Sequence, residues 1–273
     1  MGELDVDALR EALGEDPDDV LPLLAAMSRA TDERLRAQVQ ALVPRLVLDR
    51  ARSGSRGRAG SGRLRRRPAH LGGDLDVDAS LEAIAGARAG GTRPSLEDLV
   101  ATSWQRPDTA VCLLLDRSGS MDGPRLVTAA MAAAAVALRS SGELAVVAFD
   151  RRAEVVVELL APVPPLLTVE RVLGLRGHGM TSLDAALRAA HRQLAPARAA
   201  RRVTVLLSDC RATDDLDPTS AARALDELVV LAPASDDEEA RRFARSVDAR
   251  VASIGRLDDL PPALDLLLGD GPG

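Results

Sequence analysis

The chain of 273 residues predicts an α/β fold: a doubly wound, mostly parallel sheet with one antiparallel edge strand, preceded by a small helical region. Two observations carry this prediction. From about residue 109 onward, short apolar runs bounded by turn residues alternate with amphipathic stretches, which is typical of a parallel sheet with helices on both faces. Before residue 50, the apolar positions instead recur at helical spacing.

Residues 1–49 are predicted to form a small bundle of helices. These helices are expected at residues 4–13, 18–28 and 31–48. Pro44 should interrupt the last of them, because proline removes a backbone donor inside a helix. Val39, Val43 and Leu46 recur at the spacing that places apolar side chains on one helix face. That face could pack on the rest of the chain or dock a partner, and the residues leave both interpretations open.

Residues 50–73 differ in composition, with arginines interleaved with glycine and serine. Low hydrophobicity and repelling like charges predict a flexible linker. A contact with an acidic partner is the second interpretation. Nucleic acid is the weakest, since no aromatic residue interleaves here and the whole chain carries a net charge of −6. Residues 74–108 should form a helix and an extended segment that pack on a domain of residues 109–273.

The domain of residues 109–273 contains the expected sheet. Strands are predicted at residues 111–115, 143–150, 153–160, 203–208, 228–231 and 250–254. A turn at Arg151-Arg152 makes the third strand the antiparallel edge. Helices are expected after Pro124, from Thr181 to about Leu194, after Ser235, and from about Pro261. Ser235 and Glu238 should form a capping box on the third of these helices, whose acidic first turn complements the helix dipole.

Composition narrows the possible functions. Aromatic residues make up 1% of the chain while hydrophobic residues make up 46%, so the core must consist of Ala, Val and Leu. Few aromatic rings are available to stack on sugars or bases, which argues against carbohydrate and single-stranded nucleic acid as ligands.

The two cysteines predict a reducing compartment. Cys112 lies in one strand and Cys210 follows the far end of another, so neighbouring parallel strands would hold the thiols more than about 10 Å apart at ~3.3 Å per residue. We therefore expect no disulfide and a cytoplasmic location. The amino terminus lacks the pattern of a signal peptide and no apolar run reaches membrane-spanning length, so no membrane association is expected.

Five residues with side-chain oxygen atoms lie at the ends of predicted strands or at the start of a predicted helix. Asp116, Ser118 and Ser120 lie on the loop between a buried strand and the helix that begins near Pro124. Open α/β sheets place their ligands at such carboxyl ends of strands. Thr181 opens a later helix, and Asp209 ends another buried strand, so three loops can converge on one cation. An oxygen-only donor set suits Mg²⁺, or Mn²⁺ as a related hard ion. The serines could instead only cap the helix.

This pattern resembles the metal-ion-dependent adhesion site of von Willebrand factor A (VWA, integrin I-like) domains, which have a Rossmann-like fold. The resemblance implies that the hydroxyls of Ser118, Ser120 and Thr181 bind the ion, while Asp116 and Asp209 act through water or as hydrogen-bond acceptors behind the ligands. It further implies a non-enzymatic module that binds proteins. A coordination position left open would take an Asp or Glu side chain of the partner.

Further segments resemble the carboxy-terminal half of magnesium-chelatase D-type subunits and stand-alone bacterial VWA proteins that pair with MoxR-type AAA+ ATPases. These segments are residues 75–83, 95–99, 116–121 and 207–212. The resemblance implies an adaptor or co-chaperone whose partner is an AAA+ ATPase or its client; the alternative is a subunit of a magnesium or cobalt chelatase-type complex. The chain itself has no Gly-x-x-x-x-Gly-Lys-Ser/Thr loop and no lysine, so it cannot bind a nucleotide in that manner.

A Ser-His-Asp hydrolase is a distant alternative. Ser118 or Ser120, His178 and Asp209 should lie near the same sheet edge. The serines lack the Gly-x-Ser-x-Gly elbow of α/β-hydrolases, and we therefore expect no catalytic residues. His178 is expected at the rim of the metal site. The three histidines and two cysteines show no spacing typical of zinc ligands.

Overall fold

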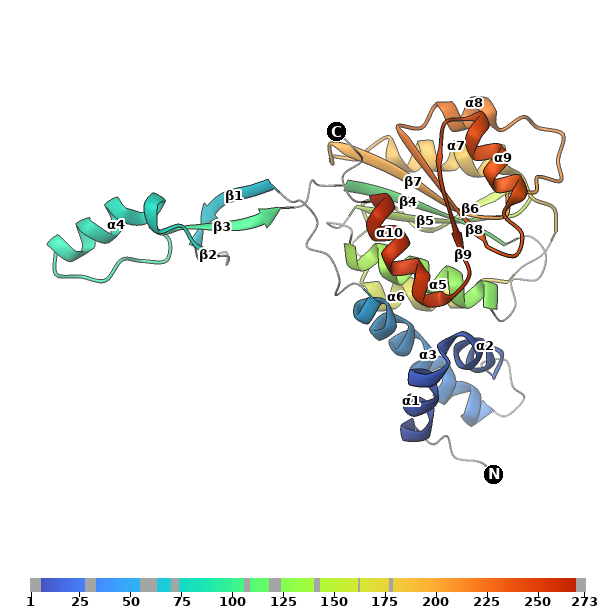
Figure 1. The fold of residues 1–273 in the computed structure, drawn as a ribbon, viewed down its shortest axis with the longest axis horizontal. Helices are drawn as coiled ribbons and strands as arrows, with labels where there is room; N and C mark the ends of the chain where they lie inside the picture. The colour runs from blue at the N-terminus through green and yellow to red at the C-terminus, as the bar shows by residue number, and fades with distance from the viewer. Residues whose placement is uncertain are drawn as a thin grey trace. The chain divides into compact units, whose positions relative to one another are not determined.

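The computed structural model describes residues 6–27, 33–54, 63–69, 74–105, 109–117, 124–139, 143–161, 163–176 and 179–268. The chain forms two compact units (Figure 1). The large unit consists of Met1–Arg58 and Asp108–Gly273, and the small unit of Ala59–Pro107.

The large unit is built on a six-stranded sheet with the order β6-β5-β4-β7-β8-β9. Its strands are β4 (Thr109–Asp116), β5 (Leu144–Phe149), β6 (Ala153–Val157), β7 (Arg201–Leu207), β8 (Glu227–Pro233) and β9 (Arg250–Ile254). All neighbouring pairs are parallel except β5 and β6, which are antiparallel at the edge. The predicted fold class is therefore confirmed. β4 is the first strand of this sheet along the chain. β5 and β6 follow on one side of it and β7, β8 and β9 on the other, so the strand order reverses between β4 and β7.

Helices cover both faces of this sheet (Figure 1). They are α5 (Pro124–Arg139), α6 (Pro165–Leu173), α7 (Leu183–Leu194), α8 (Thr219–Arg223), α9 (Glu238–Ser246) and α10 (Leu260–Leu268), with a 3₁₀ turn, η2, at Leu257–Asp259. Alternate residues of β4 serve the two faces: Leu113 joins the core beneath α5, α6 and α10, and Leu114 joins the core beneath α7, α8 and α9. Strands buried on both faces explain the continuous apolar runs in the sequence.

The amino-terminal helices are α1 (Val6–Glu15), α2 (Pro17–Met27) and α3 (Glu33–Gly54). Of these helices, α2 and α3 pack on the outer surface of α5, and α1 packs on α2. Val39, Val43 and Val47 of α3 are 0–2% exposed and belong to the same core as α5. Residues 129–136 of α5, mostly alanine, are buried because the sheet lies on one side and α2 and α3 on the other.

The predicted break at Pro44 is wrong, because α3 runs from Glu33 to Gly54 without interruption. Pro44 removes one backbone hydrogen bond from the helix. The burial of Val43 and Val47 on either side of it holds the helical path, so tertiary packing outweighs the local penalty.

The small unit is a three-stranded antiparallel sheet with one helix. Its elements are β1 (Arg63–Pro68), β2 (Asp74–Leu75), α4 (Val77–Ala89) and β3 (Val100–Gln105), and the sheet order is β1-β3-β2. Asp76 caps α4 by accepting the Ala79 N–H at 3.0 Å and pairs with Arg66 at 2.8 Å. The backbone hydrogen bond from Ala79, followed by the bond from Arg66, lowers the pKa of Asp76.

Part of the segment predicted as a flexible linker over residues 50–73 is therefore ordered. α3 extends to Gly54, and Arg63–Pro68 forms β1. Composition does not reveal that β3 supplies hydrogen bonds along the whole of β1, from Arg63↔Gln105 to Pro68↔Val100. Residues 55–62 and 70–73 lie outside the described residues, and packing of 74–108 on the domain of residues 109–273 stays a prediction.

The predicted capping box of Ser235 and Glu238 is also wrong. Helix α9 begins at Glu238 with Asp237 as its N-cap, and Asp237 makes no capping hydrogen bond with its side chain. Its carboxylate instead accepts hydrogen bonds from the Ser253 hydroxyl and from Arg241. These two bonds, the one from Ser253 first, lower the pKa of Asp237. The acidic first turn of α9 is as expected.

The cysteines and the lengths of the helices bear on two further expectations. Cys112 and Cys210 are not paired, as predicted, and both are buried. Among the helices of the described ranges, none combines the length and the apolar character needed to cross a bilayer.

Candidate metal and binding site

The candidate site lies where the strand order reverses. β4 and β7 are parallel neighbours, with Leu115 opposite Leu207, so their carboxyl ends lie at the same edge of the sheet. Asp116 is the last residue of β4, and Asp209 follows the end of β7 by two residues. A crevice forms at such a reversal because the connections from the two strands leave toward opposite faces.

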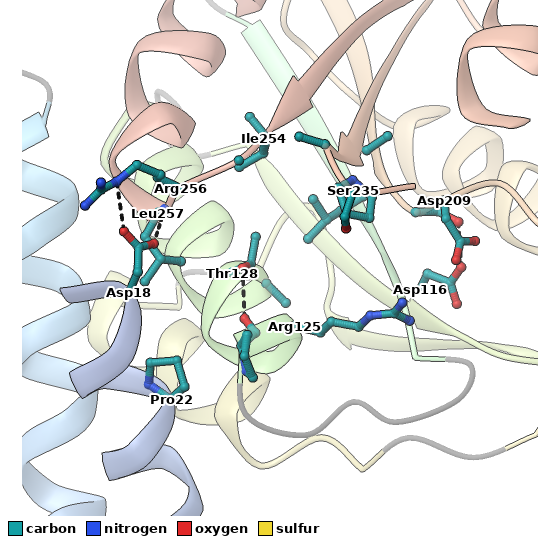
Figure 2. Close-up of a pocket in the computed structure, with 18 residues that line it drawn as sticks. Asp18, Pro22, Asp116, Arg125, Thr128, Asp209, Ser235, Ile254, Arg256 and Leu257 are labelled. Carbon is teal, nitrogen blue, oxygen red and sulfur yellow. Dashed lines mark hydrogen bonds and ion pairs between the residues drawn. The ribbon is translucent and has the colours of Figure 1, made fainter. Parts of the chain in front are cut away.

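Hydrogen bonds orient both acidic residues, and Ser208 makes the one to Asp116. Its hydroxyl donates a hydrogen bond to Oδ2 of Asp116 at 2.5 Å and accepts the Cys210 N–H at 2.9 Å. Asp209 accepts the Arg211 N–H at 3.0 Å. Figure 2 shows the carboxylates of Asp116 and Asp209 pointing toward one another. The sequence prediction missed Ser208, although a polar residue that ends an apolar strand beside Asp209 was a usable signal.

Cys210 follows Asp209 and is buried beside the two acidic residues. Its backbone adopts the left-handed conformation, with φ of 60°, in the turn that follows Asp209. Burial raises the pKa of its thiol, and the charges of Asp116 and Asp209 raise the pKa further. The thiol therefore stays protonated at neutral pH.

Hydrogen bonds hold the loop that carries Thr181 between two other loops. The Thr181 N–H donates to Oγ1 of Thr213 at 2.7 Å, and its carbonyl accepts the Thr213 N–H at 3.0 Å. The Ser182 N–H donates to the carbonyl of Asp150, just beyond β5, at 2.8 Å. Since β5 and β7 flank β4, these contacts bring Thr181, 2% exposed, to the same edge as Asp116 and Asp209.

Arg117 anchors the start of the loop that follows β4. Arg117 donates its N–H to the Phe149 carbonyl at 2.8 Å, and its guanidinium bridges Asp150 at 3.0 Å and Glu154 at 2.6 Å. This side chain therefore fastens the end of β4 to the β5–β6 hairpin. Ser118, Ser120 and His178 lie outside the described residues, so their part in the site stays a prediction.

The donor set fits a hard cation. The predicted ligand residues at this edge of the sheet, Asp116, Thr181 and Asp209, offer only oxygen atoms, which Mg²⁺ and Mn²⁺ prefer. Within the described ranges, no three His, Cys, Asp or Glu side chains gather as a metal-binding group. A nitrogen and sulfur site of the zinc type is thus not found among those residues.

A groove of about 630 Å³ leads away from the two carboxylates (Figure 2). It follows the carboxyl ends of β7, β8 and β9 and ends at α2, with the first turns of α5 along its other side. Asp116 and Asp209 lie at one end, and Asp18 and Pro22 of α2 lie at the other. Its volume is within the range of about 300–1,000 Å³ usual for binding pockets.

Contacts from α2 and α3 hold the segment that closes the far end of the groove. Oδ1 of Asp18 accepts the Leu257 N–H at 2.7 Å, and Oδ2 lies 3.2 Å from Nε of Arg256. At the end of α3, Nε of Arg50 donates to Oδ1 of Asp258 at 2.8 Å. Helix α2 is thus part of the groove wall, and α3 supports the segment beside it.

The mostly parallel six-stranded sheet, with one antiparallel edge pair and helices on both faces, is the fold of a VWA domain. VWA domains commonly bind a divalent metal. More narrowly, the chain belongs to the family of VWA domain containing CoxE-like proteins, whose sequence profile matches residues 48–266. No curated protein matches the chain significantly.

Several solved structures are similar to this chain at low sequence identity. Proximal thread matrix protein 1 from the mussel byssus is 12% identical with a TM-score of 0.51, over 59% of this chain and 47% of that chain. A von Willebrand factor type A protein from Catenulispora acidiphila is 24% identical with a TM-score of 0.48, over 60% of this chain and 42% of that chain. The protein BatB from Bacteroides thetaiotaomicron is 15% identical with a TM-score of 0.47, over 59% and 97%.

Proposed function

We propose that the protein is a non-enzymatic, Mg²⁺-dependent protein-binding module that captures an Asp or Glu side chain of its partner. The observation that supports this most directly is the pair of facing carboxylates, Asp116 and Asp209, beside the Thr181 loop. VWA domains are generally interaction modules rather than enzymes.

Electrostatics favour a cation at this place. Two carboxylates that face one another repel, and a divalent ion between them removes that cost. The Ser208 hydroxyl orients Asp116, and the Arg211 N–H orients Asp209. The hydroxyls of Ser118, Ser120 and Thr181 would hold the ion, and Asp116 and Asp209 would accept hydrogen bonds from its waters. Neutral ligands leave the ion electrophilic, which suits capture of an anionic side chain.

The partner in this proposal is an AAA+ ATPase or a client delivered to it, and the compartment is the cytoplasm. This part rests on the resemblance of residues 75–83, 95–99 and 207–212 to proteins that work with such ATPases. The chain has no lysine and hence no nucleotide loop of its own, so mechanical work must come from a separate protein.

Calorimetric titration of the full chain with Mg²⁺ and Mn²⁺ tests the metal site. Thr181→Ala should weaken binding, whereas Ser246→Ala, which removes a hydroxyl just before β9 at the opposite edge of the sheet, should not. Equal binding by both variants would contradict the proposal. Purified MoxR-type ATPase should then bind the unmodified chain with Mg²⁺, lose it with chelator and regain it on return of the ion.

A further inference from the structure

The groove gives the proposed partner a more specific chemical description. It begins at the candidate metal site, and its two ends differ in charge and polarity. The inference below rests on the proposed function, since it concerns the segment that would present the acidic side chain.

The near end of the groove contains an arginine in an electrostatically unfavourable place. Arg125 lies in the first turn of α5, which contains no acidic residue. The amino-terminal end of a helix carries partial positive charge, so it favours anions and disfavours an arginine. Figure 2 shows the guanidinium extending across the groove toward Asp116. Within the described ranges no carboxylate forms an ion pair with Arg125. A guanidinium with this orientation can receive a carboxylate in a bidentate manner.

The middle and far parts of the groove are apolar and electrically balanced. Side chains of Leu207, Ala232, Ile254 and Leu257 line it between the strand ends and α5. At α2, the charge of Asp18 is already matched by Arg256 and by the Leu257 N–H. Pro22 adds an apolar surface beside it. This end therefore suits an aliphatic side chain rather than a second charge.

We propose that the groove binds an extended segment of the partner in which an acidic residue is followed by an aliphatic one. The acidic side chain would lie at the Asp116–Asp209 end, within reach of the bound cation and of Arg125. The aliphatic side chain would lie against Ile254, Leu257 and Pro22. The amino-terminal helices then contribute directly to partner binding, because α2 forms the far wall.

Two small carboxylates provide a first test, with the full chain and Mn²⁺ as a paramagnetic ion. Acetate carries only the charged group, whereas 4-methylpentanoate adds an aliphatic tail, and relaxation of their protons reports binding. We expect the tailed acid to bind at least about tenfold more tightly, since several CH₂ equivalents leave water. Equal affinity would overturn the groove inference and leave the metal site intact. Binding of neither acid in a metal-dependent way would instead contradict the proposed function.

Variants at Arg125 separate recognition from a structural role. Arg125→Ala should weaken binding of both acids while metal affinity stays equal or rises, because a cation facing Asp116 has been removed. Arg125→Lys should restore part of the acid binding. A loss of metal and acid binding together, or no change in either, would contradict the assignment of Arg125.

A blocking variant tests the path of the tail. Ser235 is exposed and lines the groove, so Ser235→Trp should reduce the affinity for 4-methylpentanoate to that for acetate. Leu266→Trp is the control, since Leu266 is 69% exposed on α10 and does not line the groove. If Ser235→Trp leaves the preference for the tailed acid unchanged, the aliphatic part binds elsewhere and the inference fails.

Discussion

Both ends of the groove contain carboxylates, but these carboxylates have different partners. At the α2 end, Asp18 accepts a backbone N–H from Leu257 and pairs with Arg256. At the other end, Asp116 and Asp209 face one another, oriented by the Ser208 hydroxyl and the Arg211 N–H. The first arrangement matches a carboxylate with a cation of the protein, and the second gathers negative charge in one place.

This difference separates carboxylates that brace the fold from carboxylates that prepare a site. Arginine is the only long cationic side chain in a protein without lysine, and it repeatedly joins distant elements. Arg201 and Arg250 both pair with Glu227, which links β7, β8 and β9. Among the described residues, Asp209 forms no such ion pair. We infer that carboxylates paired with arginine stabilise the fold, and that the cation for Asp209 comes from outside the chain.

The largest expected effect concerns metal affinity at the Asp209 end. Asp209→Ala should weaken Mg²⁺ or Mn²⁺ binding on the order of 10–100-fold, the effect typical of losing a residue that orients the ligands of a metal. Calorimetry measures the affinity, and circular dichroism checks that the fold is kept. Asp18→Ala should leave the affinity unchanged. If both variants lose metal equally, the distinction between the two ends is wrong.

The next effect concerns stability at the other end. Asp18→Ala should lower the free energy of unfolding by about 1–3 kcal/mol, because the Leu257 N–H loses its acceptor and Arg256 loses its partner. Urea unfolding measures the change. Asp19→Ala is a matched control, since this neighbour is exposed, and it should change stability by less than about 0.5 kcal/mol. Equal stability of the two variants would show that Asp18 does not stabilise the fold.

Sequence patterns predicted the sheet well because each strand carries a local signal. The strand at residues 250–254 was predicted with its observed bounds, and Pro124 begins α5 as expected. Asp18 was not foreseen as a site residue, since its acceptor bond joins it to Leu257 across 239 positions. Thr213 was missed for the same reason: its bonds to Thr181 depend on the path of a loop that contains no periodic pattern.

The errors arise where tertiary contacts oppose local preference. Pro44 predicts a helix break, but buried valines keep α3 continuous. The arginines of β1 predict a linker, but β3 pairs with that strand along its length. Helix α6 was not predicted either, although Pro164 and Pro165 lie at its start, because the prolines were not recognised as the beginning of a helix. For α3 and β1 the decisive partner lies far along the chain, whereas the signal for α6 was local.

The smallest expected effect is the pH dependence of stability that comes from Glu227, a carboxylate paired with arginines. The side-chain hydrogen bond from Arg201, with the charges of Arg201 and Arg250, lowers the pKa of Glu227 in the folded protein. The unfolded chain therefore binds the proton more readily, since its glutamate has a pKa of about 4.3. Glu227 then contributes stability that is fully present above that pKa and is lost as the pH falls through it toward the lower pKa of the folded state.

Replacing this carboxylate with an amide should remove that dependence. Urea midpoints measured between pH 7 and pH 3 should fall less steeply for Glu227→Gln than for the unmodified protein, with the variant less stable at neutral pH and the two curves converging in acid. Glu238→Gln should follow the unmodified protein closely, because the Glu238 carboxylate is 84% exposed and its pairing with Arg242 is weakened by solvent. Parallel curves for Glu227→Gln and the unmodified protein would show that the two arginines do not stabilise the charged form. The contrast between carboxylates braced by arginine and those gathered at the metal site would then rest on Asp18 alone.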